Sequence, residues 1–224
     1  MNRIQRAFVP TLALLALLCS VPASSGVVNA PDVITVDTVN ATSGVVNVPV
    51  YIRDVSGTPL GVDQPAGMHI QSYSIKVNYS PASAVSSVTF NRAGVTAPLT
   101  PLSEFTPASA GAISLLDVFQ ESTNPIPFTL NAAAPGNQVA NLRVVLNPTI
   151  TVGTVITLSL DATLTQLANE NGTTKETTTL TTLTLVDGSI TVPVGFVYDI
   201  PALSTWALIL LAAALAIVAI RVRM

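Results

Sequence analysis

The amino-acid sequence predicts an all-β protein, an antiparallel β-sandwich that carries a membrane-directed segment at each end of the chain. Apolar and polar residues alternate with a two-residue period over several stretches, which is typical of strands that bury one face. Turns rich in Gly, Pro, Asn and Ser separate these stretches at short intervals. Long apolar stretches occur only near the ends, at 8–18 and, without interruption, at 207–220. We therefore expect one sandwich domain, over residues 33–193.

The first predicted strands precede residue 80. In the second of them Val46, Val48, Val50 and Ile52 alternate with other residues and form an aliphatic row on one face. Pro49 lies in the same strand and cannot donate to a ladder, so we expect it at a sheet edge or facing away from a neighbour. The strands predicted in this part are 33–37, 46–53 and 73–79, and the Gly- and Pro-rich stretch 57–67 is predicted as a loop.

The rest of the domain continues the pattern. Further strands are predicted at 85–90, 113–119, 139–146, 155–167 and 189–193, with a short edge piece at 128–130, which brings the total to about nine. Residues 183–185 lead into the last of these strands. The stretch 155–167 has the cleanest alternation. The stretch 92–111 contains prolines at 98, 101 and 107, so we expect a long surface excursion there. Short strands joined by regular turns indicate an antiparallel sandwich.

Several framework motifs resemble those of cohesin-type domains. The strand 44–50 contains Val48-Pro49-Val50, the strand 73–79 ends in a turn over 78–81, and Asp187-Gly188 opens a closing strand. The resemblance spans roughly residues 33–192. It implies a nine-stranded jelly-roll sandwich and a protein-binding module, since cohesins of cellulosomes bind calcium-loaded dockerin modules through one sheet face. The matching segments are framework strands, so no dockerin-contacting residue is carried over.

The same fold also occurs with other functions. Cohesins are structurally related to some carbohydrate-binding modules, which makes a glycan-binding module the alternative reading. Exposed aromatic side chains on one sheet face would favour a glycan ligand, whereas an apolar face without them would favour a protein partner. The sequence has no pair of carboxylates with glycosidase spacing, no triad and no phosphate loop. His69 is the one histidine, and we expect it to be a loop residue rather than a catalytic one, so no enzyme activity is predicted.

The N-terminus has the pattern of a secretory signal peptide, residues 1–23. Arg3 and Arg6 precede the apolar stretch, and Val21-Pro22-Ala23 supplies small residues for cleavage after Ala23. Cys19 raises the alternative of a lipoprotein, but the leucine directly before it fits a lipobox poorly. Residues 24–32 are then a linker. Without Cys19 the exported chain has no cysteine, which excludes disulfides and thiol chemistry.

The exported part, residues 24–200, is acidic. It carries five basic residues against all twelve acidic residues of the chain, a net charge of −7. This charge argues against nucleic acid as a partner. Neither a cofactor nor a metal site is predicted. Asp161, Asn169, Glu170 and Asn171 could bring oxygen ligands for calcium to one end of the sandwich, but their spacing is not that of an EF-hand.

The C-terminal end predicts a membrane span. Residues 203–220 form an apolar helix of 18 residues, roughly 27 Å long, against a hydrocarbon core of about 30 Å. Trp206 suits the headgroup level, and Arg221 and Arg223 stop the transfer, which leaves residues 221–224 as a cytoplasmic basic end. Residues 194–202 link this span to the sandwich.

The same end resembles the C-terminal sorting domains on which bacterial exosortase-type enzymes act, in particular the variety with an Ile-Pro-Thr-Leu-Ser signature. The motif residues are Ile200, Pro201, Ala202, Leu203, Ser204 and Trp206. Ala202 stands where the signature has Thr. The resemblance implies a sorting peptidase as a partner, an inner-membrane intermediate and delivery to the cell surface or extracellular space. A permanently tethered single-span protein shares every feature except the motif. The terminal arginines argue against a GPI-type signal.

Overall fold

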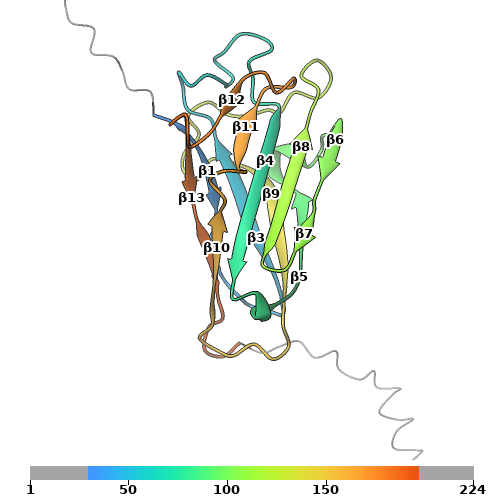
Figure 1. The fold of residues 1–224 in the computed structure, drawn as a ribbon, viewed down its shortest axis with the longest axis vertical. Coiled ribbons are helices and arrows are strands. Elements are labelled where there is room, and N and C mark those ends of the chain that lie inside the picture. Colours follow the sequence, from blue (N-terminus) through green and yellow to red (C-terminus); the bar gives the residue numbers. More distant parts are fainter. Residues whose placement is uncertain (1–29, 197–224) are drawn as a thin grey trace, which may run out of the picture.

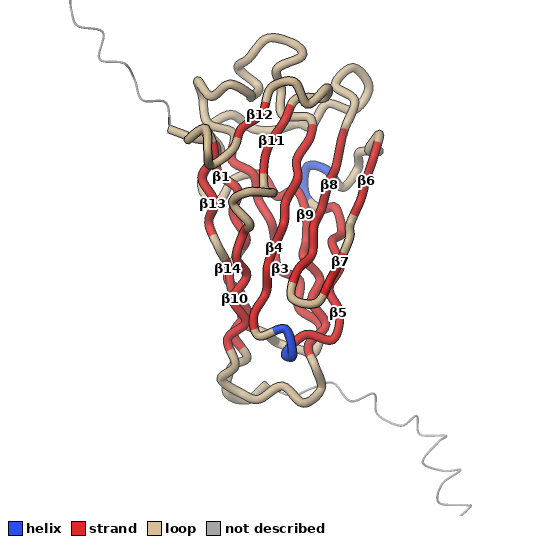
Figure 2. Tube along the Cα trace, viewed as in Figure 1, coloured by secondary structure: helices blue, strands red, loops and turns tan. Residues whose placement is uncertain are grey.

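The computed structural model describes residues 30–196, and these form a sandwich of two β-sheets packed face to face (Figures 1 and 2). The first sheet has the strand order β13-β1-β3-β9-β5. Its strands are β1 (Asp32–Val36), β3 (Val45–Arg53), β5 (Val85–Arg92), β9 (Asn137–Leu146) and β13 (Leu183–Val186).

The second sheet has the order β12-β11-β4-β10-β14-β2, and β8 extends it by pairing with β4, β6 and β7. Its strands are β2 (Thr38–Asn40), β4 (Ser72–Ser80), β6 (Ser103–Phe105), β7 (Ala108–Ser109), β8 (Ala112–Val118), β10 (Val155–Leu160), β11 (Gln166–Ala168), β12 (Lys175–Glu176) and β14 (Gly188–Thr191). Two short 3-10 helices, η1 (Ala82–Ala84) and η2 (Gly94–Thr96), flank β5.

Alternating side chains of both sheets form one core. The predicted aliphatic row of β3 is confirmed, because Val46, Val48, Val50 and Ile52 are all buried. The facing sheet contributes its own inward rows, from β4, β8 and β10, and the largest fully buried side chains include Tyr73, Phe119, Ile75, Ile113, Leu115 and Ile156. The outward residues of the same strands are polar or small for the most part. The alternation of apolar and polar residues therefore determines which face of each strand is buried.

The N-terminal segment crosses from one sheet to the other at Asp37. Pro49 of the central strand β3 faces this crossing, where its carbonyl accepts the N–H of Asp37 at 3.0 Å just after β1 ends. The proline therefore lies in the middle of a sheet, but at a point where no ladder donor is needed. Gly188 adjoins the same crossing, and a Cβ on it would lie 2.1 Å from the carbonyl oxygen of Asp37.

The structure corrects the predicted strand count and the purely antiparallel pairing. Fourteen strands occur within residues 30–196 rather than nine, and two pairs are parallel, β1 with β13 and β14 with β2. The predicted strand 155–167 ends at Leu160, because Oδ1 of Asp161 accepts the N–H groups of Thr163 and Leu164 and turns the chain. The excursion 92–111 contains β6 and β7, and residues 128–130 form no strand.

The predicted signal peptide (1–23) and membrane helix (203–220) lie outside the described residues. Within residues 30–196, no helix has the length and apolar character needed to cross a membrane. The segment 192–196, which leads toward the C-terminal tail, lies at the lower end of the sandwich in Figure 1, beside the loop that joins β9 to β10.

Candidate functional site

The outer face of the second sheet carries an exposed apolar row. Phe105 of β6 lies directly opposite Leu116 of β8, and Leu116 lies opposite Ser74 of β4. The Oγ of Ser74 donates to the carbonyl of Leu164 at 2.9 Å, which brings that residue to the far end of the row. Phe105 is 62% exposed, Leu164 50% and Leu116 36%. We call Phe105, Leu116 and Leu164 the outer apolar row.

Polar groups border this row on the same face. Lys76 of β4 lies opposite Ser114 of β8, two residues along each strand from the pair Ser74 and Leu116. Its ammonium forms an ion pair with Asp161 at 3.2 Å. Burial raises the pKa of Asp161, but the backbone N–H of Thr163, the ammonium of Lys76 and the backbone N–H of Leu164 together outweigh it, so the pKa lies below its usual value. The outer face of this sheet thus combines an exposed apolar row with a neighbouring ion pair.

Aromatic residues do not form a platform on this surface. Phe105 is the one largely exposed aromatic side chain among residues 30–196, since the tyrosines and the remaining phenylalanines of that range are buried or half-buried. The cluster of exposed aromatic side chains that the sequence analysis set as the mark of a glycan ligand is therefore not found among residues 30–196.

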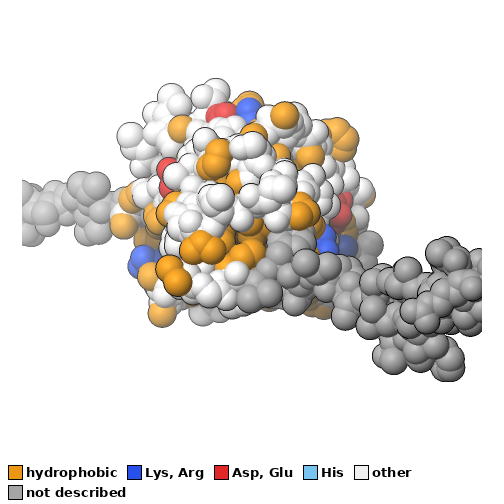
Figure 3. Space-filling model, turned by 90° about the horizontal axis from the view of Figure 1, so that it is seen from below, with side chains coloured by type: hydrophobic (Ala, Val, Ile, Leu, Met, Phe, Trp, Pro, Cys, Tyr) orange, Lys and Arg blue, Asp and Glu red, His pale blue; other side chains and the backbone are white. Residues whose placement is uncertain are grey.

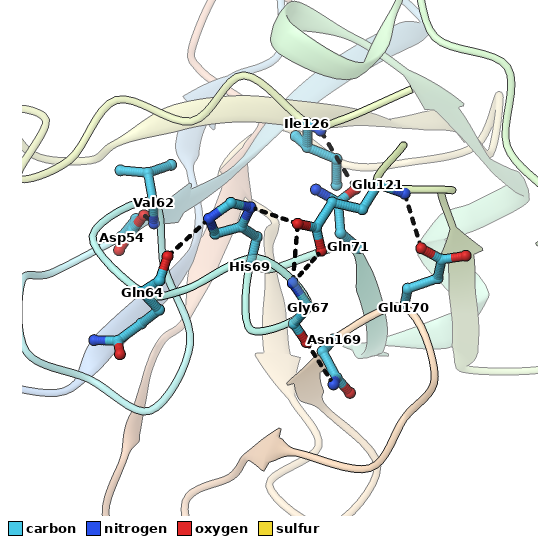
Figure 4. Close-up of polar contacts among 10 residues, drawn as sticks. All are labelled: Asp54, Val62, Gln64, Gly67, His69, Gln71, Glu121, Ile126, Asn169 and Glu170. Atoms are coloured by element: carbon cyan, nitrogen blue, oxygen red, sulfur yellow. Dashed lines mark hydrogen bonds and ion pairs between the residues drawn. The ribbon is translucent and has the colours of Figure 1, made fainter. Parts of the chain in front are cut away.

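A second polar cluster ties together three loops at the upper end of the sandwich (Figure 4). The carboxylate of Glu121 accepts the N–H of Gly67 at 3.0 Å and contacts Nδ1 of His69 at 3.0 Å. The backbone N–H of Glu121 donates to Glu170 at 2.9 Å, and the amide of Asn169 donates to the carbonyl of Gly67. Glu121 therefore joins the loop 54–71 to the loop after β11. We call these five residues the apical cluster.

His69 acts within this cluster as a structural link. Its Nε2 meets the carbonyl of Gln64 at 3.0 Å while Nδ1 meets Glu121, so both ring nitrogens face acceptors (Figure 4). His69 lies in the loop 54–71, outside any strand, as the sequence predicts.

Buried carboxyl groups fix the loop 54–71 from below. Asp32 accepts the N–H of Val55 at 2.7 Å, Asp54 that of Val62 at 2.9 Å, and Glu176 that of Leu60 at 2.8 Å. All three carboxyl side chains are fully buried. Burial raises the pKa of each, that of Asp32 to about 9, with the hydrogen bond and charge of Glu176 as further causes. These carboxyl groups hold backbone in place.

The oxygen atoms weighed for calcium do not share one site. Asp161 is engaged by Lys76 and its own turn, whereas Asn169 and Glu170 bond within the apical cluster. No group of three His, Cys, Asp or Glu side chains within the described range has an arrangement that would hold a metal ion. The residues that the sequence did not single out are Glu121 and the buried carboxyls, because their partners lie far away along the chain.

The predicted sorting residues lie outside the described part of the chain, but they fall within a match to a known sequence family. Residues 200–224 match the family model of the IPTL-CTERM motif, which confirms the resemblance of this end. A search of curated protein sequences finds no match to the chain.

Comparison with solved structures identifies the sandwich as a cohesin fold. The cohesin CaCohA2 from Clostridium acetobutylicum matches with a TM-score of 0.50 and 22% identity, over 74% of this chain and 92% of that one. The third cohesin of ScaC from Acetivibrio cellulolyticus, solved in complex with the ScaB dockerin, matches with a TM-score of 0.51 and 16% identity, over 72% and 99%. The sixth cohesin of scaffoldin B from the same organism matches with a TM-score of 0.50 and 14% identity, over 72% and 99%, and was solved with a dockerin of Cel5. The predicted resemblance is confirmed at the level of fold.

Proposed function

We propose that this chain is an exported bacterial surface or matrix protein whose cohesin-like sandwich binds a protein partner without catalysis. The observation that supports it most directly is the outer apolar row on a sheet face that carries a single exposed aromatic side chain. Two of the similar cohesins reported above were solved with dockerins, so a dockerin-like module is the partner class to test first. Glycan binding is the alternative, and the one exposed aromatic residue supports it weakly.

The C-terminal tail supplies the second half of the proposal. The IPTL-CTERM match over residues 200–224 supports delivery through the membrane and processing by an exosortase-type peptidase at the motif Ile200–Trp206. In this scheme residues 203–220 span the inner membrane as an intermediate, Arg221 and Arg223 stay on the cytoplasmic side, and the released sandwich reaches the surface or the extracellular space.

The intact mass of the protein from native cells, measured in each cell fraction, tests the tail. A mass that ends near Pro201 in an outer or extracellular fraction is expected. A mass that still includes Met224, in the inner membrane only, contradicts the sorting step and leaves a permanently tethered binding domain.

Photo-crosslinking in cells tests the binding face. A benzoylphenylalanine at position 105 is expected to form a covalent adduct with one protein, and Leu116→Asp in the same chain should abolish it. The matched control places the same group at Val186, which is 42% exposed on a strand of the opposite sheet. Equal adducts at both positions, or attachment at position 105 to glycan alone, would contradict a protein-binding face.

A further inference from the structure

The lower end of the sandwich, where the chain leads toward the sorting tail, has no charged side chain in its loops. Four segments form this end, the loops 41–44, 81–84, 147–154 and 192–196, and none of them contains Asp, Glu, Lys, Arg or His. The opposite end holds the apical cluster and the acidic loop 54–71. The two ends of the sandwich therefore differ sharply in polarity.

Two exposed valines lie on the loops of this uncharged end, Val194, which is 92% exposed, and Val152, which is 51% exposed. We call these two residues the lower valine patch. Val155 (49% exposed) and Val45 (40%) lie at its rim, at the first residues of β10 and β3, and face outward from opposite sheets. Figure 3, seen from below, shows apolar side chains interspersed with uncharged polar groups and backbone over the visible part of this end, with most charged side chains away from the centre of the view.

Backbone hydrogen bonds hold the loops of the patch together. The N–H of Gly153 donates to the carbonyl of Val192 at 2.8 Å, and the N–H of Val192 donates back to Thr154 at 2.9 Å. The N–H of Ala41 donates to Thr191, and that of Leu146 donates to Gly44. Val152 and Val194 are thus carried on adjoining turns that are fixed to the strands, and their exposure is built into the fold.

We propose that the lower valine patch rests on the membrane surface while the tail is inserted, so that the sandwich stands end-on with its apical cluster pointing away. The inference rests on the membrane insertion of the tail proposed above. The predicted span begins at Leu203, seven residues after Phe196, and a chain of that length reaches at most about 25 Å. This is shorter than the ten-residue strand β9, about 33 Å long, so the sandwich stays close to the bilayer.

The chemistry of the patch suits the interfacial region of a bilayer. Valine side chains gain free energy on leaving water for the acyl boundary, and the absence of charged groups in these loops removes the cost of bringing ions toward hydrocarbon. Because no basic residue contributes, the contact does not depend on anionic lipid or on salt. The orientation leaves the outer apolar row, which runs along the side of the sandwich, accessible to a partner.

Single-cysteine probes test the orientation in the full-length chain. In a Cys19→Ser background, Val194→Cys and Val152→Cys carry an environment-sensitive fluorophore, and Val62→Cys, 40% exposed in the loop 54–71, is the apical control. The protein is reconstituted in phosphatidylcholine vesicles that contain lipids with a quencher near the headgroup. Because interfacial groups lie within about 5–10 Å of that boundary, we expect quenching at least about twofold stronger at 194 and 152 than at 62, unchanged by salt.

The outcomes separate this inference from the proposed function. A chain that floats with the vesicles but shows equal, weak quenching at all three positions is anchored by its tail without end-on contact, and overturns the inference alone. A chain that does not float at all contradicts the anchoring on which the inference rests. A fluorophore at position 194 that is protected from aqueous iodide but is not quenched by the lipid would indicate that a second copy of the chain covers the patch. That result also overturns the inference of membrane contact. Val152→Asp combined with Val194→Asp should reduce quenching at a probe on position 45 while flotation persists.

Discussion

The phenol hydroxyl of Tyr73 donates a 2.7 Å hydrogen bond to Oδ2 of Asp117 in the core of the sandwich, where both side chains are fully buried. The two residues are direct cross-strand partners on β4 and β8. Burial raises the pKa of Asp117 to about 6, and the hydrogen bond from Tyr73 opposes that rise. The ring of Tyr73 also packs against Phe119, with centroids 6.3 Å apart. A polar pair thus fastens the sheet that carries the outer apolar row.

Tyr73→Phe is expected to lower the free energy of unfolding by about 1–3 kcal/mol, because it leaves a buried carboxyl oxygen without its donor. The loss should be larger at pH 8 than at pH 5, since Asp117 is ionised in the folded state only above about pH 6. Urea unfolding at both pH values measures this. Tyr79→Phe, which removes a half-exposed 3.3 Å bond to Ser109, should change stability by less than about 0.5 kcal/mol. Equal losses at the two pH values for Tyr73→Phe would refute the coupling.

The pair Asp32 and Glu176 predicts that the protein loses stability as the pH rises. The pKa of Asp32 is raised by burial, and by its contact with Glu176, to about 9, from 3.8 in the unfolded chain. The folded state therefore binds a proton that the unfolded state releases, and the stability present below about pH 4 declines up to about pH 9. Thermal unfolding at pH 5, 7 and 9 should show a falling Tm.

Asp32→Asn isolates this effect. The side-chain oxygen of Asn still accepts the N–H of Val55, and its amide nitrogen supplies a donor that faces Glu176 without a titratable proton. We expect a flatter dependence of Tm on pH than in the wild type. Asp37→Asn, which changes a carboxylate outside this pair, should run parallel to the wild type. If Tm falls with pH as steeply in Asp32→Asn as in the wild type, the pH dependence of stability comes from other groups.

Local sequence pattern predicted the framework strands because their alternation is a property of neighbouring residues. The buried row of β3 and the inward Tyr73, Ile75 and Val77 of β4 follow directly from it. The pattern fails at Asp161, where one side chain captures backbone N–H groups and ends a strand whose alternation continues to Thr165. Alternation also carries no information on whether two strands pair in parallel.

The candidate sites depend on contacts between distant parts of the chain, which local pattern does not encode. The bond from Leu60 to Glu176 joins residues 116 positions apart, and the contact of His69 with Glu121 joins two separate loops. The outer apolar row likewise needs the register of β6 on β8, and β6 lies in a stretch that its prolines indicated as irregular. The tail was the exception, because a sorting motif is linear in the sequence.

We predict that the chain can cross between the two sheets at Asp37 only if residue 188 is a glycine. In Gly188→Ala the added Cβ would lie 2.1 Å from the carbonyl oxygen of Asp37 and 2.6 Å from that of Val36, so backbone must move. We expect a loss of about 2–3 kcal/mol in the free energy of unfolding, measured by urea denaturation. Ser189→Ala at the next position, whose hydroxyl is exposed, should stay within about 0.5 kcal/mol of wild type. Similar values for both variants would mean that the crossing relaxes freely.

Removal of the Glu121 side chain is expected to loosen the apical loops without unfolding the sandwich. Glu121→Ala deletes the acceptor of the Gly67 N–H and of His69, while its own backbone bond to Glu170 remains possible. Because loop contacts open with less free energy than core strands, the change should appear as faster hydrogen exchange at 64–71 and 169–174, with strands β3 and β9 still protected. Glu104→Ala, which removes an ion pair with Arg92 at 2.7 Å, is the matched control and should leave exchange in both segments unchanged. Faster exchange throughout β9 in Glu121→Ala would show that the apical cluster supports the whole fold. Unchanged exchange in both loops would show that Glu121 does not hold either loop in place.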